Sequence, residues 1–169
     1  MPSQPISLYI PQDQQEALAP ALAIFRRCLQ SRGFETALVG EVDQAQVSVS
    51  LHPSLSQEAF QIADGEPGGI RISAGDALGL LYGIGKVLRS SSYQGSRFTP
   101  TAWRGASVPQ KEVRGIYFAT HFHNFYQDAP LEQVERYIEE LALWGYNTLS
   151  VWFDMHHYTG MDDLAAQEM

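Results

Sequence analysis

The sequence predicts a small α+β domain followed by a β-α-β unit, and three observations carry this prediction. Short apolar stretches with strand-like alternation occur in both halves of the chain, and amphipathic stretches with helical spacing lie between them. Residues 93–112 are rich in Ser, Gly, Pro and Thr, as is typical of a connection between two units. The length of 169 residues suits one domain, or a small domain plus part of another.

A strand and then a helix open the chain. Residues 6–10 alternate apolar and polar side chains like a strand. Apolar residues then recur at helical spacing, namely Leu18, Leu22, Phe25 and Leu29. Pro20 lies inside that pattern, so the helix either begins near it or kinks there. Gly33 provides the stop.

Three short strands and a second helix complete the first domain. We expect strands at 45–51, 59–63 and 69–73, the last two joined by a turn at 64–68. The helix from about Asp76 to Arg89 carries its apolar residues on one face, and Asp76 caps its start. Residues 1–92 are therefore predicted to fold as β-α-β-β-β-α.

The connection at 93–112 contains Phe98 and Trp103, which suggests that it is packed down. After it, residues 113–119 and 146–153 read as strands, and between them Pro130 opens a helix that Gly145 ends. Strands separated by one helix are expected to be parallel, with a right-handed crossover. Because a closed eight-stranded β/α barrel needs roughly 250 residues, residues 113–169 would hold only about the first quarter of one.

Composition excludes several classes of protein. The 11 Lys and Arg against 19 Asp and Glu give a net charge of -8, which argues against a nucleic-acid partner. No run approaches the roughly 18 apolar residues of a membrane span, and no signal peptide is visible, so we expect no membrane partner and leave the compartment open. Cys28 is the only cysteine, which excludes an intrachain disulfide or a thiolate metal cluster.

Polar and aromatic side chains crowd behind the two late strands. The strand at 113–119 is followed by His121, His123, Asn124 and Tyr126, and the strand at 146–153 by Asp154, His156, His157 and Tyr158. Loops after the carboxyl ends of parallel strands converge on one edge of a sheet, where active sites form. The alternative is that these loops merely pack on the neighbouring domain.

Individual residues support more than one interpretation. His121 and His123 at alternate positions resemble the metal ligands of amidohydrolases, which gives a metal-dependent barrel as one alternative function. A non-catalytic carbohydrate-binding or scaffolding module is another. Trp103 and Trp152 have the chemistry to stack on a sugar or to pack in a core. Asp154 could accept bonds from hydroxyls or cap a turn, and Arg114 could pair with a nearby carboxylate.

Three segments resemble a known family. Residues 69–84 read GIRISAGDALGLLYGI, which is similar to the end of the small domain that precedes the barrel in family-20 β-N-acetylhexosaminidases; related barrels such as α-glucuronidases carry the same domain type. Pro109 and the pair Arg114-Gly115 resemble the entry into the first barrel strand, and residues 145–149 resemble the second. The resemblance covers about residues 60–155.

The resemblance implies a fold and a site. The fold class is an α+β N-terminal domain (1–92), a packed connection (93–112) and the first β-α-β of an incomplete β/α (TIM-like) barrel (113–169). In the family, the Arg of the Arg-Gly pair binds sugar hydroxyls, which makes Arg114 a substrate-binding candidate. The acidic residue that follows in the family is absent from 117–119, and the family's Arg-His-Phe is approximated by residues 120–122.

The complete form is then expected to be a glycoside hydrolase that acts on terminal hexosaminides or uronides without a cofactor or metal. The family's catalytic Asp-Glu pair follows the fourth barrel strand, so we expect no catalytic residue within this chain and no activity from it alone. The expected sugar-binding residues are Arg114, His121, His123, Asp154 and His156. The unfinished barrel should expose apolar surface and strand edges, which predicts self-association.

Overall fold

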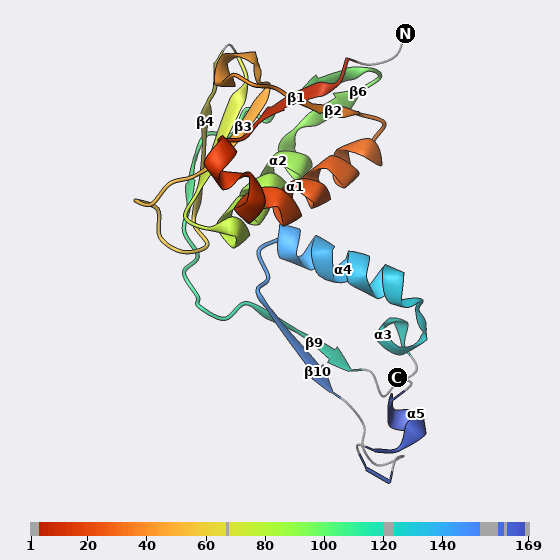
Figure 1. Ribbon diagram of the computed structural model, residues 1–169. Coiled ribbons are helices and arrows are strands. Elements are labelled where there is room, and N and C mark those ends of the chain that lie inside the picture. The colour runs from red at the N-terminus through yellow and green to blue at the C-terminus, as the bar shows by residue number, and fades with distance from the viewer. Residues whose placement is uncertain (1–3, 67, 120–123, 153–158, 161, 168–169) are drawn as a thin grey trace. The chain divides into compact units, whose positions relative to one another are not determined.

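The computed structural model describes residues 4–66, 68–119, 124–152, 159–160 and 162–167. The chain forms two compact units, shown in Figure 1: the first comprises Met1–Gln110 with Leu143–Gly145, and the second comprises Lys111–Ala142 with Tyr146–Met169. Within the described residues, no helix combines the length and the apolar character needed to cross a membrane.

A six-stranded sheet forms one layer of the first unit. Its order is β2-β1-β3-β5-β4-β8. The strands are β1 (Ile6–Tyr9), β2 (Thr36–Leu38), β3 (Val47–Leu51), β4 (Phe60–Asp64), β5 (Ile70–Ala74) and β8 (Gly105–Ser107). The strands β2, β1, β3 and β5 run parallel, whereas β4 pairs antiparallel with both β5 and β8. The expected hairpin around residues 64–68 is thereby confirmed.

Two helices, α1 (Gln15–Gln30) and α2 (Ala77–Ser90), lie side by side against the sheet (Figure 1). Short 3-10 turns, η1 (Gln12–Gln14) and η2 (Val42–Gln44), precede α1 and β3. The core between the layers is apolar, and its largest fully buried side chains include Phe25, Phe34, Leu18, Ile72, Leu80 and Ile84. As predicted, Asp76 caps α2, since its Oδ1 accepts a hydrogen bond from the Gly79 N–H at 2.7 Å.

The predicted order β-α-β-β-β-α lacks one strand, β2, of the part of this unit that ends with α2. β2 pairs in parallel with β1, yet its three residues show neither alternation nor full burial, so no local pattern marks them. The first helix begins at Gln15 and continues through Pro20, so the alternative in which the helix begins at that proline is wrong. Pro20 is exposed there, where solvent can satisfy the main-chain carbonyl that its missing N–H leaves free.

The connection after α2 belongs to the first unit. The strands β6 (Ser92–Gln94) and β7 (Arg97–Thr99) form a hairpin, and β8 adds to the edge of the main sheet. Phe98 is 8% exposed and contacts Phe34. Trp103 packs near Phe60, and the Lys86 Nζ of α2 lies 5.0 Å from the centroid of its ring. Both aromatic residues that suggested a packed connection are therefore held by the domain.

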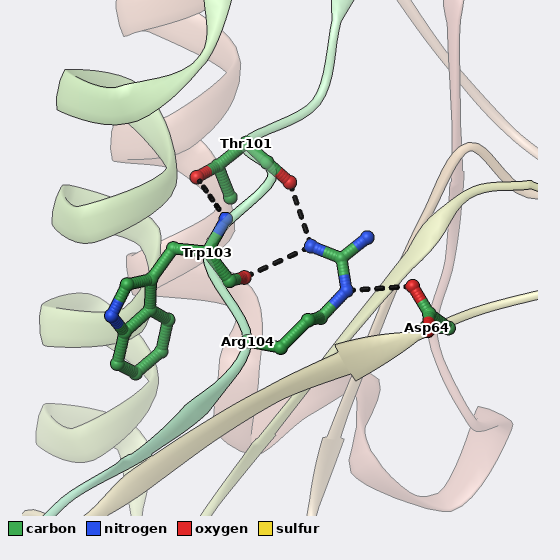
Figure 2. A network of polar contacts seen from close by, with 4 residues as sticks. All are labelled: Asp64, Thr101, Trp103 and Arg104. Carbon is green, nitrogen blue, oxygen red and sulfur yellow. Dashed lines mark hydrogen bonds and ion pairs between the residues drawn. The ribbon is translucent and has the colours of Figure 1, made fainter.

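A polar network ties this connection to β4 (Figure 2). The Arg104 Nε donates to the Asp64 Oδ1 at 2.7 Å, and the Arg104 Nη1 donates to the carbonyls of Thr101 at 2.7 Å and Trp103 at 2.9 Å. The Trp103 N–H donates in turn to the Thr101 hydroxyl at 3.1 Å. One guanidinium thus satisfies carbonyls of the connection that no strand partner reaches.

The second unit contains a two-stranded parallel sheet of β9 (Gly115–Ala119) and β10 (Thr148–Trp152). The helices are α3 (Phe125–Asp128), α4 (Leu131–Leu143) and α5 (Leu164–Gln167). A parallel strand-helix-strand arrangement was predicted here, with the helix opened by Pro130, and both features are confirmed. The described residues contain two strands of this sheet, so the barrel itself stays a prediction.

Candidate functional site

The carboxyl edge of β9 and β10 is where the sequence places a site. The two strands are in register from the pair Gly115 and Thr148 to the pair Ala119 and Trp152. Both strands therefore end at the same level, and the segments that follow them start from one edge. In parallel α/β proteins, ligands bind at this edge.

Asn124 organises the first of these segments. Its Nδ2 donates to the carbonyl of Ala119, the last residue of β9, at 2.6 Å. Its Oδ1 accepts from the Tyr126 N–H at 3.1 Å, which caps the short helix α3. One carboxamide therefore holds both the end of the strand and the start of the helix, and this fixes the place where the chain returns to the sheet edge.

An aromatic cluster joins β9, α3 and α4. It consists of Phe118, Phe125, Tyr126 and Tyr137. The Phe118 ring stacks on Tyr126 with centroids 3.9 Å apart, and Tyr137 of α4 lies 5.9 Å from Phe118. Burial raises the pKa of the Tyr126 phenol, and the hydrogen bond and the charge of Tyr137 raise it further. These ring contacts pack the short helix α3 and the helix α4 against Phe118 near the end of β9.

Tyr137 was missed as a member of this cluster. Its position relative to Val134 and Leu141 nevertheless follows the i, i+3 and i, i+4 spacing of one helix face. That spacing is the signal that could have found it. Tyr126, by contrast, was among the residues predicted to gather behind the strand.

Arg114 lies at the opposite end of β9. Its side-chain Nη1 donates to the Lys111 carbonyl at 2.7 Å, within the segment that leads into the strand. Ala119 lies five positions after Arg114, which is about 16 Å along an extended strand. The described residues therefore do not bring this guanidinium to the carboxyl edge where the histidine-rich segments begin.

Asn147 joins the amino ends of the two strands. Its Oδ1 accepts from the Arg114 N–H at 3.0 Å, its Nδ2 donates to the Glu112 carbonyl at 2.8 Å, and its own N–H donates to the Arg114 carbonyl at 3.0 Å. This clamp was also missed by sequence reasoning, because its partners lie more than thirty positions earlier in the chain. It holds Arg114 in a defined main-chain position.

The other four predicted sugar-binding residues, His121, His123, Asp154 and His156, lie outside the described residues. The histidine pair that favours an amidohydrolase lies there too. Among the residues that are described, no group of three or more His, Cys, Asp or Glu side chains is placed to hold a metal ion.

Comparison with known proteins gives structural matches only. No family model matches the sequence, and no curated protein matches it either. The GH20 exo-β-N-acetylglucosaminidase from Vibrio harveyi, solved in complex with N-acetylglucosamine, matches with a TM-score of 0.67 at 20% identity, over 88% of this chain and 22% of that one. The GH20 β-N-acetylhexosaminidase from Streptomyces coelicolor matches with a TM-score of 0.66 at 18% identity, over 86% and 30%.

A third match belongs to another glycosidase family. The GH115 4-O-methyl-α-glucuronidase BtGH115A matches with a TM-score of 0.65 at 18% identity, over 89% of this chain and 25% of that one. The chain has the fold of a segment of these glycoside hydrolases. The resemblance expected from residues 60–155 is thus confirmed at the level of fold, and the chain spans between a fifth and a third of the length of the enzymes it matches.

Proposed function

We propose that the chain is the N-terminal portion of a glycoside hydrolase that removes terminal hexosaminide or uronide units. In this proposal the first unit buttresses a β/α barrel, and β9, α4 and β10 begin that barrel. The catalytic acids come from outside the chain, so the 169 residues alone are inactive. The fold shared with GH20 and GH115 enzymes supports the class of reaction, since both groups cleave glycosidic bonds.

The observation that carries the proposal is the exposure of β10. Parallel strands are normally covered on both faces, and β10 has the apolar composition of such a strand. All five of its residues are nevertheless exposed, including Leu149 at 39%, Val151 at 54% and Trp152 at 54%. Apolar residues of a parallel strand are normally buried by neighbouring strands and helices. Their exposure here supports a sheet that continues beyond β9 and β10.

The proposed sugar pocket is formed by the segments that carry His121, His123, Asp154 and His156. Arg114 is included because of the family resemblance, although the described geometry places it at the amino end of β9. Imidazole, carboxylate and guanidinium groups donate to and accept from sugar hydroxyls, and the guanidinium also pairs with a uronate. Asn147 acts as a positioning residue, because it holds the main chain on both sides of Arg114.

The test compares a longer protein that contains this chain with the 169-residue chain alone. Both are assayed on chromogenic β-N-acetylhexosaminides and uronides, with and without a chelator. We expect the longer protein to release the chromophore whether or not the chelator is present, and the short chain to release none. Activity that the chelator abolishes would instead support the metal-dependent alternative, and a longer protein inert on both substrates would contradict the proposal.

The role of Arg114 is tested in the active protein by Arg114→Ala, with Arg136→Ala on the exposed surface of α4 as the matched control. Loss of a charged hydrogen bond to substrate should raise KM by about tenfold or more. An Arg114→Ala enzyme with the KM of the control would remove Arg114 from the pocket without affecting the proposed class of reaction.

A further inference from the structure

A polar cleft lies at the end of the first unit where β1 begins. Its volume is about 790 Å³, and it is lined by the start of β1, by η2 and by the strand β7. Figure 1 shows β1 and β6, the partner of β7, at the same end of the domain. Ligand sites in proteins typically measure roughly 300–1,000 Å³, so the cleft has room for a sugar unit.

The residues lining this cleft share one chemistry. Its polar side chains are carboxamides, hydroxyls and a single guanidinium, namely Gln4, Gln44, Gln46, Ser7, Ser96, Thr99 and Arg97. Among the described residues that line it there is no carboxylate, although the chain carries a net charge of -8. An anion bound in this cleft would therefore contact the Arg97 guanidinium, and no carboxylate among the described lining residues would repel it.

Two of these side chains are held in place. The Gln46 N–H donates to the Ser7 Oγ at 2.9 Å, and the Gln46 Oε1 accepts from the Ser7 N–H at 3.3 Å. This reciprocal pair orients the Gln46 carboxamide and leaves both protons of its Nε2 without a partner among the described residues. The preorganised donor loses little conformational freedom when it binds a hydroxyl.

Arg97 is placed by the packing of its neighbour. Phe98 turns into the core, with its ring centroid 5.6 Å from that of Tyr93, and alternation along β7 sends Arg97 to the opposite face. Within the described part of the chain, the Arg97 side chain makes no hydrogen bond or ion pair. Its planar fork of N–H donors matches the two oxygens of a carboxylate.

We propose that this cleft binds a saccharide that carries a carboxylate, such as a uronate. The Arg97 guanidinium binds the carboxylate. The Gln46, Gln44 and Ser96 side chains bind the ring hydroxyls, because both kinds of group can donate and accept hydrogen bonds. The site lies wholly in the first unit and has no catalytic group. It therefore adds a saccharide-binding role to the proposed hydrolytic one.

The test titrates methyl β-glucuronide into the full 169-residue chain and monitors binding through the amide chemical shifts in NMR. Methyl β-glucoside, which has the sugar ring without the carboxylate, and acetate, which has the carboxylate without the ring, are the comparison ligands. We expect the glucuronide to shift amides of residues 4–7, 44–46 and 96–99 and to bind more tightly than either comparison ligand. Shifts confined to residues 114–152 would overturn this proposal, whereas loss of glycosidase activity would leave it standing.

Two variants probe the recognition chemistry. Arg97→Gln should weaken glucuronide binding by about tenfold or more, whereas Arg71→Gln, at an exposed position of β5 outside the cleft, should not change it. Gln44→Glu adds a carboxylate to the cleft at an exposed position and should also weaken binding through repulsion. Equal affinity of the parent and the Arg97→Gln chain, or of glucuronide and acetate, would overturn the proposal.

Discussion

The rings of Phe118 and Tyr126 stack with centroids 3.9 Å apart and planes 14° from parallel. Phe118 comes from β9, and Tyr126 from the short helix α3, so the stack packs that helix against the strand. Phe118 is 2% exposed, whereas its neighbour Tyr117 is 50% exposed. The apolar contacts of the second unit thus concentrate on one face of β9.

Replacing Phe118 by Ala should destabilise the second unit strongly. A buried Phe→Ala change costs about 3–5 kcal/mol, because it removes apolar burial and leaves a cavity. Tyr117→Ala, on the exposed face of the same strand, should stay within about 0.5 kcal/mol. Hydrogen exchange of the β9 and β10 amides reports both effects, and equal protection in the two variants would contradict the packing described above.

Asn124 offers a test that separates its two hydrogen bonds. Asn124→Ala loses the α3 cap and the bond to the Ala119 carbonyl, and should cost about 1–2 kcal/mol of stability in the second unit. Asn124→Asp keeps the cap acceptor and loses only the donor, so it should lie between the parent and Asn124→Ala in denaturant unfolding. If Asn124→Asp were as unstable as Asn124→Ala, the helix cap would contribute little to the stability of the second unit.

Asp76 holds two main-chain donors of the first unit, the N–H groups of Gly79 and Glu58. Asp76→Ala should lower the free energy of unfolding by about 1–3 kcal/mol, because both donors lose their partner in a partly buried place. Asp76→Asn keeps one oxygen acceptor and should lose less. Thermal unfolding followed by circular dichroism ranks the three proteins, and an Ala variant that melts with the parent would refute the role of the cap.

Stability should fall at alkaline pH because of two partly buried phenols, those of Tyr93 and Tyr126. Burial raises the pKa of Tyr93 above its ordinary value of 10.0, against the opposing effects of the Arg32 cation and the Ser91 hydrogen bond. A raised pKa in the folded state means that the stabilisation is complete below about pH 10 and is lost as the pH rises through the folded pKa. Tyr126 acts in the same direction.

The denaturant midpoint of the parent should therefore decline as the pH rises above about 10, the ordinary pKa of a tyrosine phenol. Tyr93→Phe removes the titrating phenol and should flatten part of that decline, although it also loses the hydrogen bond to the Leu88 carbonyl at 3.2 Å. Tyr117→Phe, which changes a half-exposed phenol, serves as the control. A pH slope identical in both variants would rule out Tyr93 as its source.

The exposed apolar strand β10 predicts that the chain self-associates. Val151→Asp should weaken association as measured by sedimentation equilibrium, because a carboxylate on this surface resists burial. Leu78→Asp makes the same apolar-to-acidic change at a 43% exposed position of the first unit and should associate like the parent. A parent chain that stays monomeric at every concentration would contradict this prediction.

Sequence reasoning worked best where a signal is local. Two alternating apolar and polar runs around a turn predict the hairpin of β4 and β5. Asp76, directly before an apolar helical face, predicts the start of α2. The strand-helix-strand order of β9, α4 and β10 follows from the same periodicities. In the candidate site, Asn124 and Tyr126 were expected at the carboxyl edge of β9, where the structure places them.

The sequence by itself determined the main elements and the crowding of polar residues behind the two late strands, because period and capping act within a few residues. Only the tertiary structure decided that β2 and β8 join the sheet, that Arg104 reaches Asp64 forty positions away, and that Asn147 clamps Arg114. Three-residue strands and single side chains carry no period of their own. Their places depend on partners that folding brings from distant parts of the chain.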